Sequence, residues 1–177
     1  MSDEIVSLSK IFDGWDGYQT SILHAIQPLS QEQLAWRPAP NLRSVGELAS
    51  HIALGRINWF SRIQAPGSAE LLQEQNALSS PTAFAYQKEE IIRWLEMSCQ
   101  MIADTLNQWT VDDLFRSYHH EYGGKIYRVT YQWTIWRILS HDQHHGGELA
   151  IMLGMQGIQV PELGDFGGHL STPPLAE

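Results

Sequence analysis

Residues 130–154 read TYQWTIWRILSHDQHHGGELAIMLG, an amphipathic pattern that a helix satisfies from end to end. Thr130 suits the N-cap, because its hydroxyl can accept a hydrogen bond from the first turn. At about 100° per residue, His141 and His145 lie about 40° apart on one face of this helix. The same face carries Ile138, Leu149 and Met152. We therefore expect a long helix that ends at Gly154 and turns two imidazoles toward an apolar core.

Apolar residues at helical spacing predict three more long helices, over residues 4–27, 44–63 and 81–108. Pro28 ends the first of them. The second begins with the pair Ser44 and Glu47, which has the spacing of a capping box. For the third, Ser80 and Pro81 read as an N-cap followed by proline in the first turn.

The connecting segments carry turn signals. Ser30 and Gln33 predict one extra helical turn before a proline-rich connector over residues 37–41, and residues 68–80 look irregular. Residues 116–129 surround a Gly-Gly pair, which indicates either a short β-hairpin or a loop. Residues 155–177, rich in glycine and proline, are expected to form a surface tail.

Four long amphipathic helices with short connections favour an all-α four-helix bundle. No internal repeat or low-complexity linker divides the chain, so we expect residues 1–177 to form a single domain.

Composition excludes several functions. The formal net charge of −9 argues against binding to nucleic acid or to anionic membranes, which requires a positive field. No apolar run approaches the roughly 18 residues of a membrane span, and the first residues do not resemble a secretory signal. The lone Cys99 fits a reducing compartment, so we expect a cytoplasmic protein. Seven Trp and only 18% charged residues suggest that an apolar face remains for a homodimer.

A third metal ligand is available on the second helix. His51 shares a helical face with Gly55, which leaves room beside the imidazole for an ion or a substrate. Three neutral nitrogen donors suit Zn, Ni, Fe(II) or Co better than Mg or Ca. His144 falls outside the core-facing stripe of His141 and His145. The alternative is that these histidines only pack in the core. The remaining histidines are expected on the surface or in the hairpin: His24, His119, His120 and His169. Of these, His120 or His169 could still reach a pocket.

Several charged and aromatic residues are candidates for the surroundings of such an ion. Asp142, Glu148 and Glu47 could orient a ligand imidazole or act as a base. Arg137 lies one turn before His141, where it is either an ordinary surface residue or the binding group for a substrate carboxylate. Trp59, Trp133 and Arg137 are the candidates for the wall of a pocket.

Three segments together resemble the DinB/YfiT-like family of metalloenzymes. Residues 42–52, LRSVGELASHI, look like the motif of its second helix, and residues 34–40, LAWRPAP, look like the approach to that helix. Residues 139–149, LSHDQHHGGEL, look like its second His motif. The likeness in order and spacing covers nearly the whole chain.

The resemblance implies an up-down-down-up four-helix bundle, a metal site formed by His51, His141 and His145, and frequent homodimers. The better-understood relatives attach low-molecular-weight thiols to substrates, or use them as in mycothiol-dependent maleylpyruvate isomerisation, while most members have no known reaction. This chain departs from the family where Gly146-Gly147-Glu148 replaces the usual Arg-Gly-Gln after the last ligand. The departure leaves the metal ligands in place and removes a basis for naming the substrate.

Three hypotheses follow. The first is a metal-dependent thiol-S-transferase or hydrolase that holds one divalent ion. Zn or Ni is the most favoured ion, and Fe or Co is the alternative. The substrate is a small molecule, and a low-molecular-weight thiol is a candidate cosubstrate. Its candidate catalytic residues are Glu148, Asp142 and Arg137. The second is a non-catalytic stress-response or ligand-binding bundle with a retained metal site. The third is a bundle whose histidines merely pack.

Overall fold

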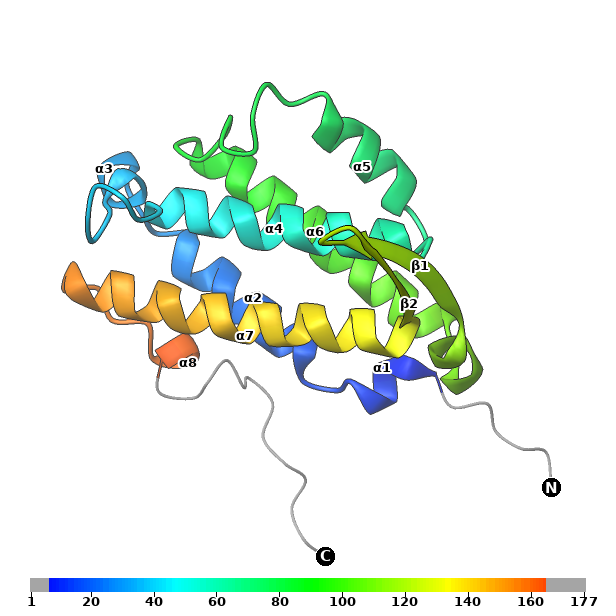
Figure 1. The fold of residues 1–177 in the computed structure, drawn as a ribbon. Coiled ribbons are helices and arrows are strands. Elements are labelled where there is room, and N and C mark those ends of the chain that lie inside the picture. Colours follow the sequence, from blue (N-terminus) through cyan, green and yellow to red (C-terminus); the bar gives the residue numbers. More distant parts are fainter. Residues whose placement is uncertain (1–6, 165–177) are drawn as a thin grey trace, which may run out of the picture.

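The computed structural model describes residues 7–164, and Figure 1 shows their arrangement. The long helices are α2 (Trp15–Ile26), α4 (Val45–Arg62), α6 (Lys88–Gln108) and α7 (Tyr131–Met155). Shorter helices are α1 (Leu8–Ile11), α3 (Gln31–Ala35), α5 (Ser68–Asn76), α8 (Pro161–Gly164) and the 3₁₀ helix η1 (Val111–Phe115). Strands β1 (Ser117–Tyr122) and β2 (Lys125–Thr130) form a small sheet. The expected mostly helical fold is confirmed.

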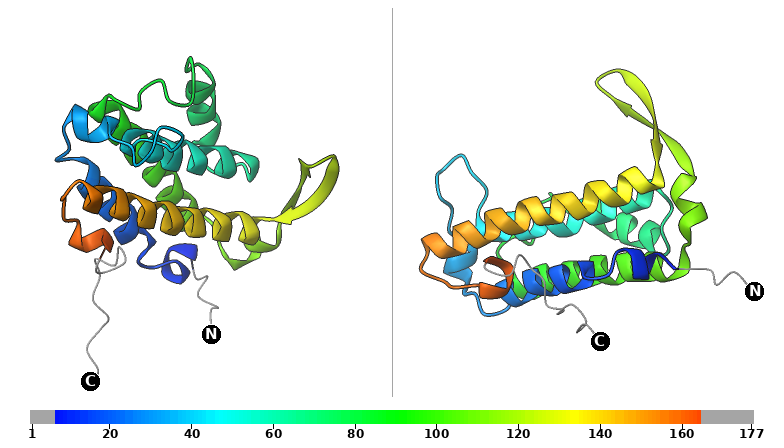
Figure 2. Two further views of the ribbon diagram at one scale, coloured as in Figure 1. Left: turned by 60° about the vertical axis from the view of Figure 1, so that its left-hand side comes forward. Right: turned by 90° about the horizontal axis from the view of Figure 1, so that it is seen from below.

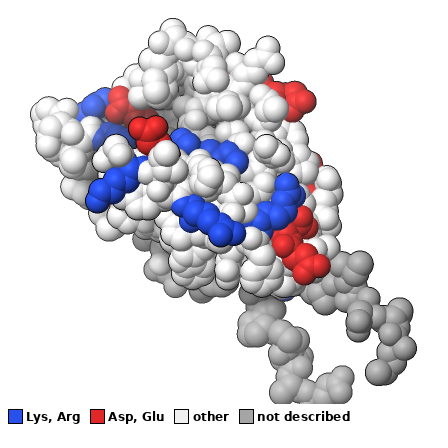
Figure 3. All heavy atoms as spheres, turned by 45° about the vertical axis from the view of Figure 1, so that its right-hand side comes forward, with Lys and Arg blue, Asp and Glu red and all other residues white. Residues whose placement is uncertain are grey.

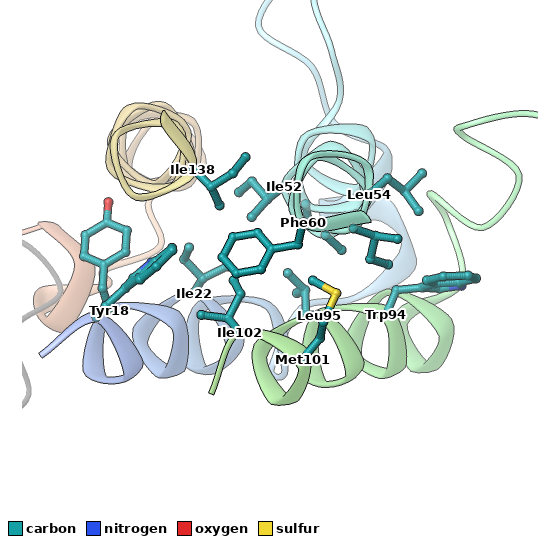
Figure 4. Packing of buried hydrophobic residues seen from close by; sticks show 14 of the residues in the cluster. Tyr18, Ile22, Ile52, Leu54, Phe60, Trp94, Leu95, Met101, Ile102 and Ile138 are labelled. Atoms are coloured by element: carbon teal, nitrogen blue, oxygen red, sulfur yellow. The ribbon is translucent and has the colours of Figure 1, made fainter. Parts of the chain in front are cut away.

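The four long helices share one apolar core. Helix α4 packs against α6 and α7, and α2 packs against the same two helices. Figure 4 shows Phe60 of α4 at the centre, among Ile22 of α2, Ile102 of α6 and Ile138 of α7, all of them buried. Full burial of each such side chain contributes about 1.5–3 kcal/mol of hydrophobic free energy. The up-down-down-up order of the helices stays a prediction.

The predicted helix starts are confirmed at three places. Ser30 with Gln33 caps α3, and Ser44 with Glu47 caps α4, each pair bonding reciprocally as a capping box. For α7, the Thr130 hydroxyl accepts a hydrogen bond from the backbone N–H of Trp133 at 3.2 Å. These bonds satisfy N–H groups that have no partner inside the helix.

The single helix predicted over residues 4–27 is wrong within the described part of the chain. Helix α1 ends at Ile11 and α2 begins only at Trp15. Gly14 has a φ of 90°, which no right-handed helix contains. Helical spacing of the apolar residues continues across the break, so the pattern alone does not reveal it.

The prediction for residues 68–108 is also wrong in two respects. Residues 68–76, expected to be irregular, form α5, and α6 begins at Lys88 rather than at residue 81. The segment before α6 is held as a loop by packing, since Phe84 stacks on Trp94 with ring centroids 5.6 Å apart. The backbone of Ala85 also lies against Gly46. Any side chain at position 46 would collide with the Ala85 carbonyl oxygen.

The hairpin alternative for residues 116–129 is confirmed. β1 and β2 pair antiparallel, and Tyr122 lies opposite Lys125 across a two-residue turn. The turn residues Gly123 and Gly124 have φ values of 58° and 72°, as a type I′ turn requires. Figure 2 shows the hairpin projecting from the helices beside the start of α7.

Part of the predicted tail is ordered against the helices. Helix α8 packs on α2 and α7, and His24 of α2 lies 2.8 Å from a carboxylate oxygen of Glu162. The remaining tail, residues 165–177 with His169, lies outside the described residues. Among residues 7–164, no helix combines the length and the apolar character needed to cross a bilayer.

Candidate metal centre

The structure brings the three predicted histidines together on neighbouring helices. His51 extends from α4, and His141 and His145 extend from α7. Each offers one ring nitrogen, and these nitrogens all lie within 4.8 Å of one another. The ring centroids are 5.0 Å apart for His51 and His141, 4.8 Å for His51 and His145, and 4.4 Å for His141 and His145.

The distance between two of the donors fits a shared ion. Nε2 of His141 lies 3.2 Å from Nε2 of His51. Ligand nitrogens about 2.0–2.1 Å from a tetrahedral Zn ion are separated by about 3.4 Å. Three imidazoles leave coordination positions open, as catalytic sites do, and nitrogen donors suit a transition ion. The residues present therefore fit a divalent transition metal.

A carboxylate fixes the tautomer of one ligand. Nδ1 of His145 lies 2.7 Å from a carboxylate oxygen of Glu148, so Nδ1 carries the donated proton and Nε2 is left as a ligand. The other Glu148 oxygen lies 3.2 Å from Nε2 of His144, whose side chain is 67% exposed. Glu148 thus supports His145 as predicted, while His144 lies on the outer side.

Burial favours the neutral form of His51 and of His145. Removal from water lowers the pKa of His51 to about 4, and the charges of Arg43 and His141 act in the same direction. Burial also lowers the pKa of His145, although its hydrogen bond to Glu148 works against that shift. Neutral imidazoles are the form that binds a metal ion.

Gly55 has a different role from the one predicted. A Cβ atom at Gly55 would lie 2.8 Å from Cε1 of His141. The space beside Gly55 is therefore filled by the His141 ring, and it is not left open for a substrate. The absence of a side chain lets α7 bring that imidazole up to His51.

Asp142 is buried in a network that ties the helices together. The single N–H of Arg56 Nε donates to both carboxylate oxygens of Asp142, at 3.0 and 3.1 Å, and Nε1 of Trp15 donates to one of them at 2.9 Å. Arg56 also donates to the Ser98 hydroxyl of α6 at 3.3 Å. Burial alone would raise the pKa of Asp142, but the Arg56 guanidinium and these hydrogen bonds hold it below its usual value. Asp142 is therefore held as a buried anion, with one oxygen 3.9 Å from Nδ1 of His141.

Arg56 was missed by sequence reasoning. It follows Gly55 on the apolar face of α4 and is fully buried. A charged residue within an apolar stripe is the signal that could have identified it, because such a group needs a buried partner. The predicted candidate Glu47 is engaged elsewhere, by the backbone N–H of Ser44, by Arg37 and by the Tyr86 hydroxyl.

The comparison with known proteins assigns the family. The family model of the DinB superfamily matches residues 16–149. The chain belongs to the DinB superfamily. The crystal structure of a DinB-like protein from Bacillus cereus ATCC 10987 is similar, with a TM-score of 0.69 over 89% of this chain and 98% of that chain. Its sequence identity of 16% makes this a likeness of fold. No curated protein matches the chain.

The departure from the usual DinB motif has a structural reason. A Cβ atom at Gly146 would lie 2.2 Å from the Tyr18 hydroxyl, so an arginine cannot occupy this position without displacing that ring. The Tyr18 hydroxyl donates to the backbone carbonyl of Gln143 at 3.1 Å. Burial, followed by the nearby Asp142 charge, raises the pKa of Tyr18 to about 12. Tyr18 thus stays neutral and packs where the family's arginine would begin.

Two hollows of this DinB member are lined by residues of α7 that lie before and after the histidines in the sequence. The larger, of about 650 Å³, lies where the hairpin meets α4 and α7. Its wall contains all three predicted wall residues, and the complete lining is Trp59, His120, Tyr122, Tyr127, Arg128, Val129, Thr130, Trp133 and Arg137. The smaller, of about 230 Å³, is lined by Pro38, Leu42, Arg43, Leu48, Glu148, Ile151 and Met152. Of the two pocket-reaching histidines suggested by the sequence, His120 does line a pocket.

Proposed function

We propose that the protein is a metal-dependent enzyme in which His51, His141 and His145 hold one divalent ion. Zn and Ni suit the donors best, with Fe(II) and Co as alternatives. The observation that carries this proposal is the convergence of three ring nitrogens within 4.8 Å of one another. The neutral state of the half-buried His51 and the fixed tautomer of His145 support it.

The proposed reaction is S-transfer from a low-molecular-weight thiol, or hydrolysis. A divalent ion at such a site supplies a lowered pKa for a thiol or a water, which makes a nucleophile near neutral pH. Glu148 is the candidate proton acceptor, since it lines the smaller hollow beside His145. Burial would raise its pKa, but the hydrogen bond to His145 and nearby positive charge lower it, so the carboxylate is ionised.

The two hollows support a reaction between two small molecules. Along α7, Arg137 of the larger hollow precedes the histidines and Glu148 of the smaller hollow follows them. In this proposal, one reactant occupies each hollow, with the histidines between them along α7. This arrangement favours transfer between a thiol and an acceptor over simple hydrolysis.

The first test is the metal content of protein purified without a His tag. Elemental analysis should find about one divalent ion per chain. Protein without metal that takes up neither added Zn nor added Ni would instead mean that the histidines only pack.

The second test is a screen of the metal-loaded protein with acceptor molecules, with and without low-molecular-weight thiols. Turnover that requires a thiol would establish S-transfer, and turnover with water alone would establish hydrolysis. Metal binding without any turnover would favour the alternative, a non-catalytic stress-response or ligand-binding bundle.

We also propose that residues 1–177 form one domain with the up-down-down-up topology of a four-helix bundle. A homodimer in the cytoplasm is proposed as the working form. Both proposals come from the sequence patterns and the family resemblance.

A further inference from the structure

The larger hollow has an unusual aromatic wall. Trp59 of α4 and Trp133 of α7 lie with ring centroids 5.6 Å apart, and Trp133 is 45% exposed. The ring of His120 meets Trp59 edge-on at 5.3 Å. Indole faces bind flat rings well, because they offer a large rigid apolar area with favourable ring–ring geometry. The wall is therefore suited to a planar, unsaturated molecule.

Two arginines border the same rings. The guanidinium of Arg137 lies over Trp59 at 4.8 Å and over Trp133 at 5.7 Å. The guanidinium of Arg62 lies over Trp59 at 5.0 Å, and its Nη1 is 3.1 Å from Nδ1 of His120. Stacking on an indole leaves the guanidinium N–H groups at its edge available to an anion.

These arginines have no carboxylate partner in the described part of the chain. Acidic residues outnumber basic ones by 20 to 11, and Arg37, Arg56, Arg93 and Arg116 each lie beside a carboxylate. No ion pair joins Arg62 or Arg137 to a carboxylate of residues 7–164, and the described lining of the hollow contains no Asp or Glu. Figure 3 shows basic groups across the middle of the face on the hairpin side. Two guanidiniums without a carboxylate beside the same pair of indoles can therefore bind a carboxylate through charge-assisted hydrogen bonds.

The hollow lies within reach of the histidines. On α7, Arg137 precedes His141 by four residues, or about 6 Å along the axis, and Trp133 precedes Arg137 by the same interval. On α4, Trp59 follows His51 by eight residues, or about 12 Å. A molecule of two fused rings on Trp133 can therefore extend a substituent toward the three imidazoles.

We propose that this hollow binds a planar aromatic carboxylate, with the ring on the exposed Trp133 and the carboxylate on Arg137 and Arg62, which Trp59 holds in place. The claim that the bound molecule is the acceptor substrate rests on the proposed metal-dependent function. The claim that it binds in this hollow is independent of that function. The guanidinium fork matches a carboxylate in two parallel hydrogen bonds, which selects a flat anion over a neutral analogue.

The test is calorimetric titration of the full chain, stripped of metal by a chelator, with 2-naphthoate. Stripping excludes coordination of the carboxylate to an ion. We expect saturable binding of one 2-naphthoate per chain, and binding of 2-naphthamide weaker by about tenfold or more. Arg137→Gln, Arg62→Gln and Trp133→Leu should each raise the Kd by about fivefold or more.

Two matched variants serve as controls. Arg116 also stacks on an aromatic ring, that of Tyr131 at 4.7 Å, and Trp136 is an exposed indole of α7 outside the lining of this hollow. Arg116→Gln and Trp136→Leu should leave the Kd for 2-naphthoate unchanged. All the substituted side chains are exposed, and far-UV circular dichroism checks that each variant is folded.

The outcomes separate this inference from the proposed function. Failure of the metal-free protein to bind 2-naphthoate, or equal affinity for 2-naphthamide, would overturn the inference. If the same sample still takes up a metal ion, the proposed function stands. Equal loss in the control variants would also overturn it. Normal 2-naphthoate binding in a protein that takes up no metal would support the binding site and remove the metal-dependent function.

Discussion

His144 and His145 are neighbours on α7 with opposite surroundings. The His145 ring is buried against His51 and His141, whereas the His144 side chain is 67% exposed. Both contact Glu148, so an alternative metal group of His144, His145 and Glu148 exists on the outer side of the helix. The two candidate metal groups differ in whether His144 takes part, so the effect of losing His144 distinguishes them.

We predict that His145→Ala lowers metal affinity by more than about a hundredfold, because it removes one of three ligands at a cost of several kcal/mol. His144→Ala should leave the affinity nearly unchanged. A competition titration of both variants with a chromogenic chelator measures this. A loss in His144→Ala as large as that in His145→Ala would place the ion in the outer group.

The lowered pKa of His51 predicts how the metal-free protein responds to acid. In the unfolded chain this imidazole titrates near 6.5, and in the folded chain near 4. Between these values the unfolded state binds more protons, so the free energy of unfolding falls as the pH decreases from about 6.5 to about 4. The lowered pKa of His145 acts in the same direction.

Urea titrations of the metal-free protein across this pH range provide the measurement. His51→Gln should flatten the decline, while His144→Gln, a change of an exposed side chain, should not. A decline that is equally steep in His51→Gln would show that other groups cause it.

Residue patterns in the sequence selected the three candidate ligand histidines, but they did not reveal the side chains that surround these histidines. His141 and His145 share a face by spacing alone, and His51 shares its face with a glycine, so all three could be selected in advance. The partners of Asp142 could not, because Arg56 and Trp15 lie 86 and 127 residues away in the chain. Only tertiary packing reveals that Asp142 is buried against Arg56 and Trp15.

At the scale of helices, the close contact of α4 and α7 depends on Gly55. A methyl group there would lie 2.8 Å from Cε1 of His141 and must push the ring or the helix aside. We predict that Gly55→Ala weakens metal binding by about tenfold or more without removing a ligand, since small misplacement of a ligand is costly.

Gly147→Ala is the matched control on α7. A Cβ atom at Gly147 would meet nothing within 4 Å, so this change should keep the metal affinity and raise stability by about 0.5–1 kcal/mol through helix propensity. Metal titration and thermal unfolding of the two variants test both statements. Unchanged affinity in Gly55→Ala would show that the His141 ring can shift without loss.

The Arg56–Asp142 pair joins α4 to α7 in the interior, where both side chains are fully buried. Removing either partner leaves an unpaired buried charge, so Arg56→Met and Asp142→Leu should each cost about 3–5 kcal/mol of stability. The double variant should cost less than the sum of the two, because no charge remains buried.

Denaturant unfolding of the two single variants and the double variant measures this coupling. The exposed pair of Arg93 with Glu74 offers the comparison, and Glu74→Ala should cost less than about 1 kcal/mol. Additive losses in the double variant would mean that Arg56 and Asp142 do not depend on each other.

Helices were predicted well where a local signal marks their ends. The capping residues Ser30, Ser44 and Thr130 each accept a hydrogen bond from the backbone N–H three residues on, so the sequence contains the whole signal. The break at Gly14 lies in its backbone, with a φ of 90°, and the segment before α6 packs against Trp94 and Gly46. Periodicity continues through both places and cannot show them.

At the scale of the whole molecule, one apolar surface remains uncovered in the described chain. It surrounds a hollow of about 480 Å³ lined by Ile11, Phe12, Leu114, Thr130, Gln132, Trp133 and Trp136, without a charged residue. Ile11 is 51% exposed and Trp136 is 61% exposed. Apolar surfaces of this kind commonly mark contacts between proteins. A two-fold dimer would bury the surface against its own copy, since the same patch then faces itself.

We therefore predict that light scattering gives about twice the chain mass of 20.1 kDa. Trp136→Glu should convert the dimer to a monomer, because a carboxylate would be placed in a desolvated contact. Ile151→Glu is the control, since Ile151 is 67% exposed near the other end of α7 and does not line this hollow. A mass near 20.1 kDa for the unmodified protein over a wide range of concentration would refute the dimer. Dissociation by Ile151→Glu but not by Trp136→Glu would move the interface to the far end of α7.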